Sequence, residues 1–199
     1  MSFSQAFILT FVPLFIVVDA IGNLPIVLSL SESMTPRERH RMIHFAILTA
    51  TSVGLIFLFF GQFILNLMNI SVGALTVAGG IILLILSLRQ LLTGRVIEAD
   101  KSEMIAVVPI GTPLVVGPAT ITTLLLLAID YDIPVILLSL SLNLLISWVV
   151  FLLGNRIAVF LGKGGLKAIS QVFNLLLAAI AVNMVIHGLE LVGVIKTVQ

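Results

Sequence analysis

A carboxylate, an amide and two residues that disfavour helices stand together inside a long apolar run. The stretch VVDAIGNLPIVLS, residues 17 to 29, contains Asp19, Gly22, Asn23 and Pro25. A carboxylate at the centre of a membrane costs about 2.5 to 3.5 kcal/mol on insertion scales, so its presence indicates a polar interior or a transport pathway. Glycine and proline interrupt a helix and leave backbone groups without helical partners. Free N–H ends attract carboxylates and free C=O ends attract cations.

A second run of the same kind follows about 95 residues later in the chain, as PIGTPLVVGPATITT from Pro109 to Thr123. Gly22 and Gly117 allow a ligand to approach the backbone closely. Thr120 offers a hydroxyl that can cap the following half-helix or contact the ligand. A zwitterion that carries both charges on one carbon atom is a suitable ligand between two such breaks.

The composition shows which elements must position these residues. Of the 199 residues, 60% are hydrophobic and only 10% are charged, and the mean hydropathy of +1.28 excludes an ordinary soluble domain. The absence of cysteine excludes disulfides and thiolate metal sites. A membrane-spanning helix needs about 20 mostly apolar residues. Six stretches satisfy this requirement: 3 to 30, 42 to 65, 72 to 92, 104 to 128, 134 to 154 and 168 to 194.

The basic residues predict the orientation of these spans. Nine of the ten lysines and arginines lie in alternate connections: Arg37, Arg39 and Arg41; Arg89, Arg95 and Lys101; Arg156, Lys163 and Lys167. The positive-inside rule puts these connections in the cytoplasm and both termini outside. Three basic residues per connection, mixed with acidic ones, are too few for a nucleic-acid surface. Thr35 and Glu38 predict a capping box at the start of the second span.

The two breaks also predict an internal repeat. The sixth span aligns with the third at an offset of 94 residues, which pairs Ala74 with Ala168 and Leu83 with Leu177. A unit of three spans must insert its second copy with opposite orientation, as in many secondary transporters. We therefore expect an all-α membrane protein of six transmembrane helices in two inverted repeats, with helices 1 and 4 broken at mid-membrane. The predicted parts are residues 1–92 with a cytoplasmic loop at 31–41, a linker at 93–103, and residues 104–199.

Structural interpretations of the same residues remain open. Asp19 could serve only as a cap for the half-helix that follows it, and either break could be a simple kink. The Gly79-Gly80 pair is more typical of close helix packing than of a ligand site. Asn143, Asn174 and Asn183 recur on the predicted inner helices, where asparagine most often joins helices. We expect at most one of Asn174 and Asn183, which lie on roughly opposed faces, to face a cavity.

The stretch DAIGNLPIVLSL resembles the Asp-Pro-x-Gly-Asn-x-Pro signature of the MarC family of integral membrane proteins, which includes the SnatA small neutral amino acid transporters. The likeness extends to the six spans, to GTPLVVGPATITT, and to LLLAAIAVNMVIHG in the sixth span. There are two departures. Ala20 stands where the family usually has proline, and Ala119 stands where a glycine is frequent.

This resemblance implies a secondary transporter of the LysE-like superfamily in the plasma membrane of a prokaryote. It would move small neutral amino acids such as glycine and alanine, coupled to protons, with no enzymatic activity and no cofactor. The expected partners are the amino acid, the proton and the lipid bilayer. The expected substrate-binding residues are Asp19, Ala20, Gly22, Asn23, Pro25, Gly117, Pro118, Ala119 and Thr120.

The nearest alternative is an exporter of cations or metal ions from the same superfamily, in which Asp19 and neighbouring oxygens would bind a hard ion. It is disfavoured because the sequence offers a single central carboxylate, which would leave a divalent ion unbalanced. An intramembrane aspartyl protease would need a second carboxylate at the same depth.

Overall fold

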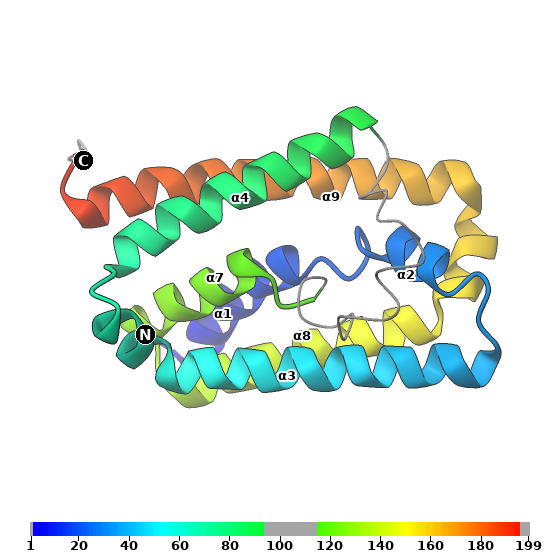
Figure 1. Cartoon of the computed structure of the whole chain (residues 1–199), viewed down its shortest axis with the longest axis horizontal. Coiled ribbons are helices and arrows are strands. Elements are labelled where there is room, and N and C mark those ends of the chain that lie inside the picture. Colours follow the sequence, from blue (N-terminus) through cyan, green and yellow to red (C-terminus); the bar gives the residue numbers. More distant parts are fainter. Residues whose placement is uncertain (1, 94–114, 196–199) are drawn as a thin grey trace.

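The structure, a computed structural model, describes residues 2–93 and 115–195, and the regular elements of these residues are all helices (Figure 1). The helices of these residues are α1 (Phe3–Val18), α2 (Leu24–Leu30), α3 (Pro36–Leu67), α4 (Val72–Thr93), α7 (Pro118–Asp130), α8 (Ile133–Leu152) and α9 (Gly154–Val192). Four segments are long and apolar enough to cross a membrane: α3, α4 up to Leu92, α8, and α9 from Gly164 onward. The helices α1 and α7 are shorter but also apolar. The chain is therefore an all-helical membrane protein.

The predicted interruption of the first span is confirmed. The helix α1 ends at Val18, and α2 begins at Leu24, with Pro25 in its first turn. Proline suits this position because its fixed φ is helical and its missing N–H would have no helical partner there. The interruption predicted within 109–123 is described only in part, since 109–114 lie outside the described residues. Val115 to Gly117 precede α7 without helical structure, and the predicted linker 93–103 is not described beyond Thr93.

The helices α1 and α7, which border the two breaks, occupy the middle of the bundle. Figure 1 shows α4 beside α9 along one edge, α3 beside α8 along the opposite edge, and α1 and α7 between these pairs. Both central helices contact helices on either side, α1 through α8 and α9, and α7 through α3 and α4. Both central helices are therefore packed against protein, which an interrupted backbone requires in a membrane.

The start of α3 has the capping box predicted from the sequence. The Thr35 N–H donates to Glu38 Oε2 at 2.8 Å, and the Glu38 N–H donates to Thr35 Oγ1 at 3.4 Å. Pro36 occupies the first helical position. These reciprocal bonds satisfy two N–H groups that the helix itself cannot satisfy, and they fix where the long helix begins.

The last helix begins earlier than the hydropathy pattern predicted. The helix α9 starts at Gly154 rather than near 168, and Gly162 interrupts it with φ 65° and ψ 171°. A side chain would disfavour this left-handed backbone, so glycine permits the change of direction. The extra segment before Gly162 contains Asn155 and Arg156, and it therefore fell outside the apolar window.

Glycines bring α4 and α9 into close contact. A Cβ atom at Gly80 would lie 2.8 Å from the Ala181 carbonyl oxygen and 3.0 Å from the Val185 nitrogen. A Cβ atom at Gly188 would lie 2.8 Å from the Gly73 carbonyl oxygen. The prediction of a packing role for Gly80 is therefore confirmed, and the small residues hold the two backbones together as in other membrane bundles.

We predict that Gly80→Ala lowers the thermal stability of the detergent-solubilised protein. The added methyl group meets backbone atoms that cannot move aside cheaply, and overpacking of this kind typically costs about 1 to 3 kcal/mol. Thermal unfolding followed by circular dichroism measures the effect. Gly164→Ala is the matched control, because no atom lies within 4 Å of its added Cβ and alanine favours helices over glycine. Equal unfolding temperatures for the two variants would refute the close packing.

Candidate functional site

Asp19 ends α1 in a backbone conformation that few residues adopt. Its φ of 46° and ψ of 55° are left-handed, and its N–H donates to the Phe15 carbonyl oxygen at 3.2 Å. Aspartate and asparagine tolerate this conformation better than most residues other than glycine. The chain therefore leaves the helix at Asp19, and the side chain turns into the bundle, where Asp19 is only 3% exposed.

The Asp19 carboxylate holds the break together through Gly22. Its Oδ1 atom accepts a hydrogen bond from the Gly22 N–H at 2.9 Å. A Cβ atom at position 22 would overlap the carboxylate, so only glycine fits there without a shift. Within the described part of the chain, Asp19 Oδ2 accepts no hydrogen bond. One carboxylate oxygen is thus used by the fold, and the other remains available to a ligand.

Asn23 connects the two sides of the same break. Its Nδ2 group donates to the Val18 carbonyl oxygen at 3.2 Å, and its backbone N–H donates to the Asp19 carbonyl oxygen at 3.0 Å. Asn23 is half-buried, as is Pro25. The Asn23 side chain therefore gives a hydrogen-bond donor to a carbonyl group at the end of α1, and its backbone precedes the first residue of α2.

Other backbone groups at the break have no partner in the described structure. The N–H groups of Ala20 and Ile21 form no hydrogen bond with any described residue. Ala20 is 5% exposed, so its N–H has little access to solvent. Buried unpaired backbone groups are rare and costly, and they mark positions where a ligand or an ordered water can bind.

The start of α7 presents a helix N-terminus to the interior. Gly117 precedes the helix in an extended conformation, and no side chain caps it. Ala119 and Thr120 in the first turn are buried, at 7% and 1% exposure. The Thr120 hydroxyl donates to the Val115 carbonyl oxygen at 3.4 Å. Pro118, by contrast, is exposed. The uncapped first turn leaves N–H groups that favour an anion.

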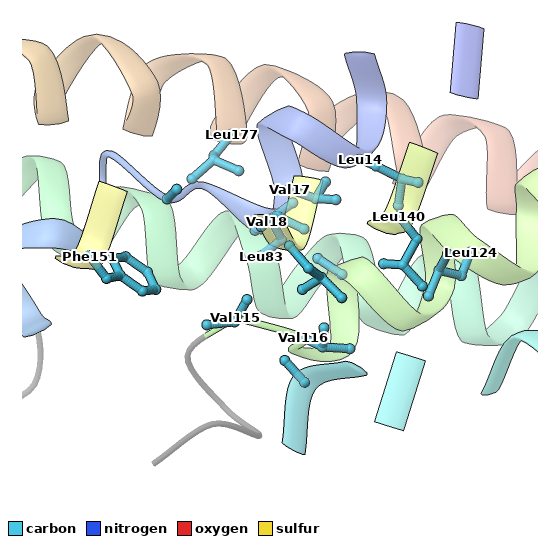
Figure 2. Close-up of a cluster of buried hydrophobic side chains, with 14 of the residues drawn as sticks. Leu14, Val17, Val18, Leu83, Val115, Val116, Leu124, Leu140, Phe151 and Leu177 are labelled. Carbon is cyan, nitrogen blue, oxygen red and sulfur yellow. The ribbon is translucent and has the colours of Figure 1, made fainter. Parts of the chain in front are cut away.

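The two breaks belong to one buried cluster. Val18 and Ala20 from the first break and Val115, Val116 and Ala119 from the second are parts of the same apolar core. Figure 2 draws Val17 and Val18 at the end of α1 in this cluster, together with Val115 and Val116 before α7. None of the hydrogen bonds among described residues joins the breaks directly. Apolar residues from both breaks thus lie in the same core, whereas Pro118 of the second break is exposed.

The contact between Thr10 of α1 and Ser139 of α8 was missed from the sequence, whereas the helix-joining role predicted for Asn143 is confirmed. Thr10 Oγ1 and Ser139 Oγ lie 2.7 Å apart and are fully buried. Asn143 Nδ2 donates to the carbonyl oxygens of Phe11 and Ser139, whereas its Oδ1 has no partner in the residues described. Ser139, Asn143 and Ser147 recur every four residues, and this spacing on an apolar helix was the signal that could have found them.

The asparagines of α9 follow the sequence prediction. Asn174 is buried, with its Oδ1 unpartnered in the described structure, whereas Asn183 is exposed. The two residues thus lie on different faces of α9.

These features define an integral membrane protein of transmembrane helices with an interrupted first span and a buried carboxylate at the interruption. The chain belongs to the MarC family of integral membrane proteins, since the model of that family matches residues 4–192. A UPF0056 membrane protein of Methanocaldococcus jannaschii is 30% identical, over 94% of this chain and 97% of its own length. The UPF0056 inner membrane protein YhgN of Escherichia coli K12 is also 30% identical, over 89% of this chain and 93% of its own. No solved structure matches the chain.

We predict that Asp19→Asn keeps the fold whereas Asp19→Ala weakens it. Asparagine tolerates the left-handed conformation and can still accept the Gly22 N–H, but alanine does neither. Loss of such a cap typically costs about 0.5 to 2 kcal/mol. Thermal unfolding in detergent should therefore place Asp19→Asn within about 0.5 kcal/mol of the unmodified protein, with Asp19→Ala clearly below it. Equal stability of all three proteins would show that the Asp19 to Gly22 bond does not hold the break.

Proposed function

We propose that this protein is a secondary transporter of small neutral amino acids, such as glycine and alanine, coupled to protons. The observation that carries the proposal is the buried Asp19 carboxylate, whose chain neighbours Val18 and Ala20 lie in the same apolar core as Ala119 at the uncapped start of α7. The membership of the MarC family, whose resemblance implied such transport, is in agreement with this function. The name of the Escherichia coli relative places that protein in the inner membrane. We expect this chain also to reside in the inner membrane of a prokaryote.

The charges at the two breaks match those of an amino acid. The C-terminal end of α1 and the Asp19 carboxylate are negative, so they favour the substrate ammonium group. The N-terminal end of α7 is positive and favours the substrate carboxylate. Broken helices supply the same pair of helix ends in many secondary transporters.

The residues at the breaks favour a small substrate. Ala20 and Ala119 are buried beside the two breaks, and Gly22 is packed against Asp19. A ligand that reaches the backbone between these residues has little room for a side chain. Glycine and alanine therefore fit better than leucine or lysine.

The helix contacts support the two inverted units proposed for the fold. An offset of about 95 residues relates α2 to α7, α3 to α8 and α4 to α9. Each contact of α7 with α3 and α4 has a counterpart in the contacts of α2 with α8 and α9. An exchange of the two units therefore maps these contacts of α7 onto those of α2, as a repeat of this kind would.

The binding of a hard cation is the second function to be tested. It has less support, since no three acidic or histidine side chains gather in the part of the chain that the structure describes. Asp19 alone would leave a divalent cation with unbalanced charge in the membrane interior.

We predict that the protein in liposomes exchanges radiolabelled glycine and takes it up when a pH gradient is applied. Asp19→Asn should reduce the gradient-driven uptake at least tenfold, because the amide neither titrates nor balances the ammonium charge. Asp132→Asn, at an exposed carboxylate, is the control and should keep the uptake.

The counterflow of glycine in the same vesicles separates the two roles of Asp19. If Asp19→Asn retains glycine exchange, Asp19 carries the coupled proton. If the variant loses exchange, Asp19 binds the substrate. If Asp19→Asn took up glycine as fast as the unmodified protein does, Asp19 would serve only as a helix cap. Transport of leucine, lysine or a metal ion in preference to glycine would contradict the proposed function.

The proposed orientation can be measured separately, because the chain contains no cysteine of its own. A cysteine at Arg37 should react with an impermeant thiol reagent only from the cytoplasmic side. A cysteine at Asp132 should react only from the outside. Both residues are exposed. The reverse pattern in intact cells would invert the topology derived from the basic residues.

A further inference from the structure

A polar cavity lies at the end of the bundle where α2 is joined to α3 and α8 to α9. Its volume is about 770 Å³. Its lining combines apolar side chains with basic and amide groups, among them Leu28, Leu152, Arg39, His40, Asn155 and Arg156. None of these residues belongs to the site proposed for the amino acid.

Arg39 is the buried cation of this cavity. It is only 9% exposed, and its Nη2 donates to the Phe151 carbonyl oxygen at 3.1 Å, at the C-terminal end of α8. This is the one hydrogen bond formed by the side chain among the described residues, and Nε is buried without any partner. A guanidinium group has five N–H donors. The bond to α8 holds the group in place and leaves most of its donors for an anion.

The other charged groups of the cavity leave a positive balance. Arg156 is exposed and forms no ion pair with a described residue. Glu32 also lines the cavity, and it has an interaction of its own. Two arginines against one glutamate give a net charge of +1 with His40 neutral. Asn155 and Ser29 add neutral hydrogen-bonding groups. An anion with several acceptor oxygens, such as a phosphate, matches this set of donors.

The surroundings indicate that the anion comes from the lipid bilayer. The segment from Gly154 to the turn at Gly162 precedes the apolar part of α9 that begins at Gly164. Val159 and Phe160 in this segment are 85% and 89% exposed. Large apolar side chains beside a basic cavity are typical of a helix that lies at the boundary between headgroups and acyl chains. The apolar lining from Leu28 and Leu152 suits the upper part of an acyl chain.

We propose that this cavity binds the phosphate of an anionic phospholipid, with Arg39 and Arg156 as its cationic ligands. Arg39 supplies a fixed, desolvated guanidinium, and Arg156 closes on the phosphate from the more exposed side. Gly154 leaves space for this arrangement, because a Cβ atom there would lie 3.0 Å from Arg39 Nη2. Basic cavities between membrane helices are recognised sites for lipid headgroups.

The binding of short-chain lipids to the purified full chain tests this proposal. The protein in an uncharged detergent is titrated with dioctanoyl phosphatidylglycerol or dioctanoyl phosphatidylcholine at constant ionic strength, and the midpoint of thermal unfolding is followed. We expect phosphatidylglycerol to bind at least tenfold more tightly than phosphatidylcholine. Arg156→Gln should weaken phosphatidylglycerol binding about tenfold, which is about 1.4 kcal/mol. Arg37→Gln is the matched control, since Arg37 is exposed on the same end of α3 and does not line the cavity.

Arg156 is substituted in preference to Arg39 because Arg39 also caps α8, so its loss could prevent folding. The unfolding midpoint without lipid verifies that Arg156→Gln is folded. Equal binding of the two lipids would overturn the proposal, and so would an equal loss of affinity in Arg37→Gln. Inorganic phosphate is tested alone in the same detergent. Stabilisation by phosphate equal to that by phosphatidylglycerol would identify a site for free anions and would overturn the lipid assignment.

Discussion

The hydrogen bond between Asp19 and Gly22 is the interaction on which the interruption of the first span depends. A membrane interior has no solvent to satisfy backbone groups that a broken helix releases, so a break persists only where protein groups replace the missing helical bonds. Asp19 takes the Gly22 N–H, and Asn23 takes the Val18 carbonyl oxygen. The left-handed backbone of Asp19 positions both bonds. The remaining N–H groups of the break, at Ala20 and Ile21, stay open to a ligand.

The arrangement of the other helices follows from the need to enclose this break. The helices α1 and α7 lie between the α3/α8 and α4/α9 pairs, and Val18 and Ala119 at their interrupted ends are buried. The close contact of α4 with α9 at Gly80 and Gly188 keeps one wall of this enclosure narrow. On the other wall, the buried contact between Thr10 and Ser139 fixes α1 against α8. Apolar contacts between helices are no more favourable than apolar contacts with lipid, so they do not select one arrangement of the bundle. Contacts between small and polar side chains supply that selection.

The parts of the structure that depend on local signals were predictable from the sequence. The break at Asp19, the start of α3 after Thr35 and the start of α4 at Val72 each depend on residues within one or two helical turns. The parts that depend on distant contacts were not predictable. Arg39 was counted among the basic residues of a loop, yet it is buried because it bonds to Phe151, 112 residues away in the chain. The early start of α9 was missed because its first segment is polar enough to fall outside a hydropathy window.

The chemistry of Asp19 favours a role beyond that of a cap. Its two structural tasks are to adopt the left-handed conformation and to accept one N–H bond. Asparagine performs both, because its side-chain carbonyl is an acceptor and it tolerates that conformation. Asparagine also carries no charge, so it would avoid the cost of placing a carboxylate in the membrane interior. A protein that needed only the cap would therefore lose nothing by carrying the amide in place of the carboxylate. The carboxylate is explained when its charge, or its capacity to take up a proton, contributes to the transport that we propose, and Oδ2 is the atom left free to do so.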